Sequence, residues 1–220
     1  MALVPIEAVL RIKDSYTTKT TAVITSVLYL ENNHLVVGAE DNTIQICTSS
    51  SSSSSCSYMQ GEGHTGAITG LTRTKNRLLF VSSSIDTTLI VWNAQTKLPT
   101  VRLVGHSKKV GGVVSLADGS VASCAADAVK VWDIDTGENT RSFTPQIVRS
   151  CNAIAASYDG LHLFVSLEAM LMGQRNSMVY VFDTATWTYK KVVSASMPFS
   201  LSLLRFGQPP QHRAYNLQSC

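Results

Sequence analysis

Short segments in which apolar and polar residues alternate recur along the chain, separated by clusters of turn-forming residues. Alternation of this kind over about four to eight residues is typical of antiparallel strands. In one group the alternating segments are 67–71, 77–83, 89–92 and 100–104. Asp86 and Thr87 separate the middle two segments, where an aspartate favours a tight turn because its side chain bonds its own backbone. The pattern predicts an all-β chain built from groups of four short strands.

Two of these groups are copies of one longer unit. Each contains a Gly-His pair, at 63–64 and at 105–106, and each ends its third predicted strand in a tryptophan, Trp92 or Trp132. About 40 residues separate the corresponding positions, a period that is typical of propeller blades and related arrays. The repeat therefore predicts the architecture before the role of any single residue is considered.

These residues and their spacing resemble the WD-repeat β-propeller family. In that family a histidine, a serine or threonine, a turn aspartate and a tryptophan form one hydrogen-bonded chain in each blade, which fixes the turns of a thin core. The resemblance implies two such structural networks, His64, Ser82, Asp86 and Trp92 in the second unit, and His106, Ser123, Asp127 and Trp132 in the third. Asp127 stands one residue nearer to its tryptophan than Asp86 does, so we expect the network of the third unit to be distorted or incomplete.

Two weaker units flank this pair. The first has Cys47 where the tryptophan is expected and no Gly-His pair before it, and the fourth has Phe182 at that position. The predicted fold is therefore an all-β WD-repeat β-propeller with four recognisable blades, incomplete or open, and a compact closed ring is the alternative. The predicted partial propeller covers 1–206: an orphan strand at 3–12, blades at 22–58, 64–104, 106–144 and 150–194, and a remnant strand at 199–206, followed by an irregular tail at 207–220.

Composition limits the expected partners and compartment. The formal net charge of +3 is scattered along the chain, so no nucleic-acid partner is expected. The N-terminus lacks the pattern of a signal peptide, and no apolar run approaches the ~18 residues needed to cross a membrane. The five cysteines form no CxxC pair, which favours reduced thiols. We expect a soluble intracellular protein, cytoplasmic or nuclear, with no membrane partner.

Two segments depart from the repeat. The serine run at 49–55 cannot bury apolar surface, so we expect a mobile connection; a cluster of phosphorylation sites is the alternative. The fourth unit carries an insertion at 167–177 in place of the turn aspartate. This insertion lengthens the connection between the second and third strands, on the face that carries the Gly-His loops. The alternative is that the two strands themselves run longer.

That face is the predicted partner-binding surface. Flexible methionines suit adaptable binding sites, an arginine can bind a carboxylate, and paired lysines can attract an acidic segment, although each is also an ordinary surface residue. The residues that flank the turn aspartates face the same end in the family. The predicted face consists of Ile85, Lys108, Lys109, Ala126, Met170, Leu171, Met172 and Arg175.

The favoured function is a non-catalytic scaffold or adaptor that binds protein partners, which rests on analogy with the family. A second possibility is an incomplete propeller that acts only when its open strand edges pair with another copy or another chain. A hydrolase is the third, because His64, Ser82 and Asp86 are the residue types of a nucleophilic triad. The same trio recurs in the next unit, which favours a structural role. The histidines lack zinc spacing, so neither a metal nor a cofactor is expected.

Overall fold

The computed structural model describes residues 20–30, 34–49, 54–144, 150–171 and 174–195. Within these residues sixteen strands form four antiparallel sheets of four strands each, and there is no helix. The first sheet contains β1 (Ile24–Leu30), β2 (His34–Ala39), β3 (Ile44–Ser49) and β4 (Ser54–Tyr58), and the second contains β5 (Ile68–Arg73), β6 (Leu79–Ser84), β7 (Leu89–Asn93) and β8 (Pro99–Leu103). The third contains β9 (Val110–Ser115), β10 (Val121–Ala125), β11 (Val129–Trp132) and β12 (Asn139–Phe143), and the fourth contains β13 (Ser150–Ala156), β14 (His162–Leu171), β15 (Gln174–Asp183) and β16 (Tyr189–Ala195).

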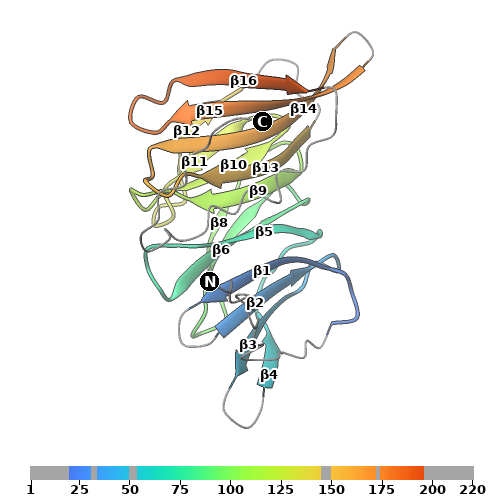
Figure 1. Cartoon of the computed structure of the whole chain (residues 1–220). Coiled ribbons are helices and arrows are strands. Elements are labelled where there is room, and N and C mark those ends of the chain that lie inside the picture. The colour runs from blue at the N-terminus through green and yellow to red at the C-terminus, as the bar shows by residue number, and fades with distance from the viewer. Residues whose placement is uncertain (1–19, 31–33, 50–53, 145–149, 172–173, 196–220) are drawn as a thin grey trace, which may run out of the picture.

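The four sheets are stacked in a row. Within each sheet the strands follow one another in chain order, and the first strands β1, β5, β9 and β13 pack against one another in sequence. Figure 1 shows the first sheet and the fourth sheet at opposite ends of the row. The described residues therefore form a four-bladed WD-type propeller that is not closed, as the sequence predicts.

Three apolar layers between neighbouring sheets make up the core. Each strand alternates its side chains between two faces, so one strand contributes to the layer on either side of its sheet. In β7, Ile90 and Trp92 face the first sheet, whereas Leu89 and Val91 face the third. Trp132 of β11 likewise packs toward the second sheet. These two tryptophans therefore each fill the space between their own sheet and the preceding one.

The third and fourth sheets approach closely at β9. Gly111 has no side chain, and a Cβ atom at that position would collide with the backbone carbonyl of Cys151 in β13. Gly112 also lies against the fourth sheet, where a Cβ atom would stand 3.3 Å from Cγ2 of Ile154. Glycine at these two positions allows the first strands of the two sheets to pack backbone against backbone.

The serine run differs from the expectation. Ser49 closes β3 and pairs with Ser54 at the start of β4, and Thr48 pairs with Ser55. The prediction of a mobile connection across all of 49–55 is therefore wrong at both ends of the run, because backbone pairing does not need apolar side chains. Residues 50–53 lie outside the described residues, as do the predicted strands 3–12 and 199–206 and the tail 207–220.

The insertion of the fourth unit forms a long hairpin. Strands β14 and β15 have ten residues each and stay paired from His162 with Asp183 out to Leu171 with Gln174. Met170 and Arg175 are register partners near its tip, and Met172 lies outside the described residues. Figure 1 shows this hairpin projecting beyond the end of the other sheets. The alternative that the two strands run longer is thus the observed one.

Candidate interaction face and its buried hydrogen-bonded chains

A buried chain of four side chains joins the Gly-His loop of the second sheet to its own strands. Trp92 Nε1 lies 2.8 Å from Ser82 Oγ, and His64 Nε2 lies 2.7 Å from the same oxygen. On the other side of the ring, His64 Nδ1 lies 2.9 Å from a carboxylate oxygen of Asp86. Asp86 also accepts hydrogen bonds from the amides of Thr65 and Thr88. The chain ties the loop before β5, the turn after β6 and strand β7 together.

Donor and acceptor capacity fixes the direction of this chain. The carboxylate of Asp86 only accepts, so His64 Nδ1 must carry a proton and donate to it. The indole of Trp92 only donates, so Ser82 Oγ accepts from Trp92 and its own hydroxyl proton is available for His64 Nε2. The chain is therefore fully satisfied when His64 is neutral, with each group donating to the next.

The local environment favours that neutral form. Burial lowers the pKa of His64, and the nearby negative charge of Asp86 opposes this only in part. Burial also acts to raise the pKa of Asp86, but hydrogen bonds from the amides of Thr65 and Thr88 and attraction to His64 outweigh it, so the pKa of Asp86 is lowered. At neutral pH the pair is thus an anionic carboxylate that accepts from a neutral imidazole.

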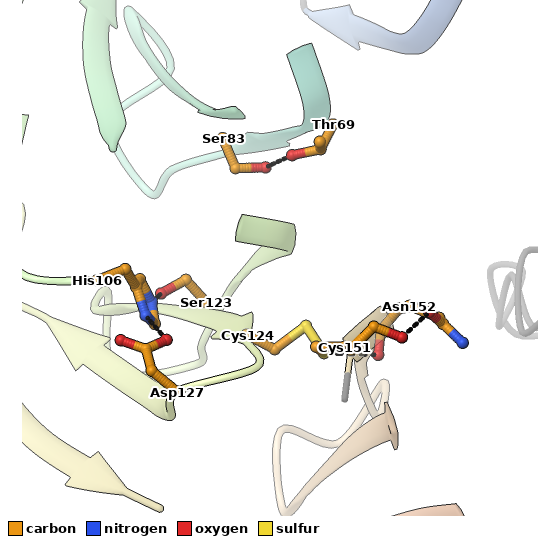
Figure 2. The surroundings of a disulfide bond; sticks show 10 residues. Thr69, Ser83, His106, Ser123, Cys124, Asp127, Cys151 and Asn152 are labelled. Atoms are coloured by element: carbon orange, nitrogen blue, oxygen red, sulfur yellow. Dashed lines mark hydrogen bonds and ion pairs between the residues drawn. A yellow bond between two sulfur atoms is a disulfide. The ribbon is translucent and has the colours of Figure 1, made fainter. Parts of the chain in front are cut away.

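The third sheet contains a complete second chain. His106 Nδ1 lies 2.8 Å from Asp127, His106 Nε2 lies 2.7 Å from Ser123 Oγ, and Trp132 Nε1 donates to the same hydroxyl at 2.8 Å. Figure 2 shows His106 between Ser123 and Asp127. Burial again lowers the pKa of the histidine. The chain is satisfied in the same order as the first.

The expectation that this third-unit chain is distorted or incomplete is wrong. The amide of Ala125 bonds the carbonyl of Ala128 at 2.9 Å, which closes a turn one residue shorter than the turn between Ser84 and Thr88. In the longer turn Thr87 takes a left-handed φ of 74°, and the shorter turn omits such a residue. Asp127 still reaches both His106 and the amide of Ser107. The shorter turn therefore accommodates the missing residue and keeps the carboxylate of Asp127 within hydrogen-bonding distance of His106.

Sequence reasoning missed two residues that support the first chain. Arg102 of β8 donates to the carbonyls of Glu62 and Gly63 at 3.0 and 2.8 Å, which holds the Gly-His loop from the outer strand. Thr88 donates its hydroxyl to Asp86 at 2.8 Å and lies 3.3 Å from Arg102. An arginine on an outer strand is an ordinary surface residue by pattern, so only its place beside the loop reveals this contact.

The prediction of reduced cysteines is wrong for four of the five. Cys47 of β3 forms a disulfide with Cys56, its register partner on β4. Cys124 of β10 forms a disulfide with Cys151 of β13, which links the third sheet to the fourth (Figure 2). Strand register creates the first pair and packing between sheets creates the second, and neither is visible as a sequence motif.

The two chains place the Gly-His loops and the turns after the second strands at one end of the sheets. The turn residue Ile85 is 47% exposed, and Ala126 is half-buried in the equivalent turn. Lys108 and Lys109, between His106 and β9, are both exposed. The hairpin of β14 and β15 extends at the corresponding turn of the fourth sheet. We refer to Ile85, Ala126, Lys108, Lys109 and this hairpin as the loop face.

The described part of the chain contains neither a group of metal-binding side chains nor a helix that could span a membrane. No group of three or more histidine, cysteine, aspartate or glutamate side chains is placed to hold a metal ion there. Across the same described ranges, no helix has the length and apolar character needed to cross a bilayer.

Residues 54–93 match the family model described as WD domain, G-beta repeat. The match begins where β4 begins and ends where β7 ends, so it includes Ser82, Asp86 and Trp92 of the first hydrogen-bonded chain. It also includes His64 of the Gly-His loop. The boundaries of the matched repeat are therefore offset by one strand from those of the second sheet.

Several curated proteins are similar to part of the chain. MST50-interacting protein 11 of Pyricularia oryzae is 38% identical over 90 residues, which are 37% of this chain and 28% of that protein. Small ribosomal subunit protein RACK1 of Candida albicans is 37% identical over 91 residues, covering 37% and 29%. WD repeat- and FYVE domain-containing protein 4 of Mus musculus is 27% identical over 129 residues, covering 56% and 4%. The chain spans less than a third of the length of these relatives.

Proposed function

This chain belongs to the WD-repeat family, and on that premise we propose that it is a non-catalytic interaction module that binds protein partners through its loop face. Two of the similar proteins are named for assembly with other components, one as an interacting protein and one as a protein of the small ribosomal subunit. We carry to this chain only the general role of presenting a rigid surface to other proteins. The same relatives support an intracellular location as part of the proposal.

One observation carries the proposal: the side chains of both buried hydrogen-bonded chains are engaged with one another and stabilise the fold. Ser82 is fully buried and its hydroxyl is engaged by both Trp92 and His64, so it is not accessible as a nucleophile. Ser123 is equally buried in the second chain. The residue types of a hydrolase triad thus serve to hold the loops, which leaves the exposed loop residues free to vary and to bind.

A comparison of variants tests the loop face. We would replace Ile85 with Asp and Lys108 and Lys109 with Glu, and would recover cross-linked partners by mass spectrometry from cells expressing each protein. The matched control replaces Arg73 and Lys75, which are exposed at the other end of the second sheet. Partners lost by the loop-face variant and kept by the control support the proposal. Equal recovery by both variants contradicts it.

Self-association is a second candidate. The first sheet lies at one end of the row, and Val27, Tyr29 and Tyr58 on that sheet are each more than 40% exposed (Figure 1). Large exposed apolar side chains on a terminal sheet are typical of a surface that pairs with another chain. Light scattering over a tenfold concentration range tests this, since a second copy would raise the mass above 23.8 kDa. A mass of 23.8 kDa at every concentration rejects it.

A further inference from the structure

A groove of about 750 Å³ lies between the first and second sheets, at the end opposite the loop face. Leu30 and Ile46, both nearly buried, form its floor. The turn between β5 and β6 contributes Arg77 and Leu78, and the turn between β7 and β8 contributes Lys97. No carboxylate is among the described residues that line it. The floor of the groove is therefore apolar, and the ammonium group of Lys97 lies at its rim.

Comparison of the three contacts between neighbouring sheets explains why this groove exists. Ser57 pairs with Ile46 on β3, Val101 pairs with Val91 on β7, and Arg141 pairs with Val131 on β11, so these three outer-strand residues hold equivalent positions. Val101 packs into the apolar layer between the second and third sheets. Arg141 lies over the ring of Trp187, 5.4 Å from its centre. Ser57 has the shortest side chain of the three and lines the groove.

The turns that face these three residues from the next sheet, each between its third and fourth strands, are equivalent as well. Lys97, Gly137 and Trp187 each donate an amide to the residue four positions earlier, at 2.9, 3.0 and 2.7 Å, and each has a positive φ, of 61°, 80° and 55°. A Cβ atom at Gly137 would lie only 2.9 Å from Val101, so that contact is closed. Trp187 fills the third contact. The first contact alone combines a short serine with a lysine, which leaves open space between two sheets.

We propose that this groove binds an acidic peptide segment that carries one large apolar side chain. Its volume lies within the roughly 300–1,000 Å³ of ordinary ligand sites, and its apolar floor suits one buried side chain. Lys97 at the rim favours a carboxylate beside that residue. Hydroxyl groups of Ser55 and Ser57 line the wall and can bond a peptide backbone. This site goes beyond the proposed function, because it lies at the other end of the sheets.

Fluorescence anisotropy with a labelled synthetic peptide tests the proposal. The probe is a seven-residue peptide of alternating aspartate and glutamate around one central phenylalanine, and the comparison probes replace the phenylalanine with serine or the acidic residues with lysine. We expect saturable binding of the first probe below about 1 mM, and at least about tenfold weaker binding of both comparison probes. Equal binding of the serine probe would show attraction of charge alone and would overturn the proposal.

Two variants locate the binding. Ser57→Val copies Val101 and narrows the groove at its wall, and Lys97→Gly copies Gly137 and relieves a left-handed backbone while it removes one rim charge. Each variant should weaken the first probe about tenfold and leave the melting temperature close to that of the wild type. Lys190→Gln is the control, since it removes one exposed charge on the fourth sheet, away from the groove, and should not change the affinity. Absence of any binding to the wild type, or equal loss in this control, rejects the groove while leaving the loop-face proposal untouched.

Discussion

Replacement of Asp86 by alanine should destabilise the protein more than the same change at Asp127. Asp86 accepts from His64 Nδ1, from the amides of Thr65 and Thr88 and from the hydroxyl of Thr88, at 2.8–2.9 Å. Its side chain is only 7% exposed. Alanine leaves the Nδ1 proton of a buried imidazole without its carboxylate. Hydrogen bonds to charged groups contribute about 1.5–3 kcal/mol each, but neighbouring groups and water recover part of this, so we expect a net loss of about 2–3 kcal/mol.

Asp127 makes fewer of these contacts. It accepts from His106 and from the amide of Ser107 at 2.8 Å, with a longer contact of 3.4 Å to the hydroxyl of Ser107. Its side chain is 18% exposed, so water replaces more of what alanine removes. We expect a loss of about 1–2 kcal/mol for Asp127→Ala.

Urea unfolding followed by tryptophan fluorescence and circular dichroism gives both values from the shift of the midpoint and the slope. Asp135→Ala, an exposed turn residue, is the matched control and should change stability by less than about 0.5 kcal/mol. Asp86→Asn keeps an acceptor for Thr88 but not the charge, and should fall between wild type and Asp86→Ala. If Asp86→Ala differs from the control by less than about 0.5 kcal/mol, the reasoning about the buried chain is refuted.

Three further predictions concern pH, packing and cysteine pairing. In the folded protein the pKa of His64 and of His106 lies below the ordinary 6.5, so the unfolded chain binds protons more readily. The melting temperature should therefore be highest above pH 6.5 and should fall as the pH drops below that value. A melting temperature that stays constant between pH 7 and pH 5 would contradict this. Gly111→Ala should cost about 2–3 kcal/mol in urea unfolding because its Cβ meets the backbone of Cys151, whereas Gly63→Ala, whose Cβ meets only Trp92 at 3.8 Å, should cost about 1 kcal/mol or less. Alkylation of the purified unfolded chain without reductant should label one of the five cysteines, and labelling of all five would refute both disulfides.

Features that depend on local pattern were predictable from the sequence. The predicted strand 89–92 lies within β7 (Leu89–Asn93). This strand was predictable because the alternation of apolar and polar residues and the turn at Asp86 both depend on residues that are adjacent in the sequence. The four groups of strands also follow from the repeat, since each group must pair its own four segments. The alternation of apolar positions likewise indicates which side of a strand is buried, as Ile90 and Trp92 illustrate.

Features that depend on packing between units were not predictable. The partner of Cys124 lies on another sheet, and no local motif marks Cys151 as its match. The third-unit chain is intact because a backbone turn can shorten by one residue and still aim Asp127 at His106, which residue counting does not show. The groove between the first two sheets arises because Ser57 is shorter than its equivalents, a difference that has meaning only once the sheets are stacked. The partner-binding role of the loop face stays a prediction.

The offset between the matched repeat and the sheet has a consequence for how the chain tolerates being cut or extended. The repeat at 54–93 supplies the outer strand β4 of one sheet and the strands β5, β6 and β7 of the next. One repeat therefore contributes strands to two neighbouring sheets. Excision of residues 54–93 would leave β1, β2 and β3 followed directly by β8, an outer strand that can take the place of β4. A break in the connection after β8 would also preserve whole sheets on both sides. Loss of one repeat therefore removes one blade whether the cut follows the repeat or the sheet, because the outer strand of one sheet can complete the other.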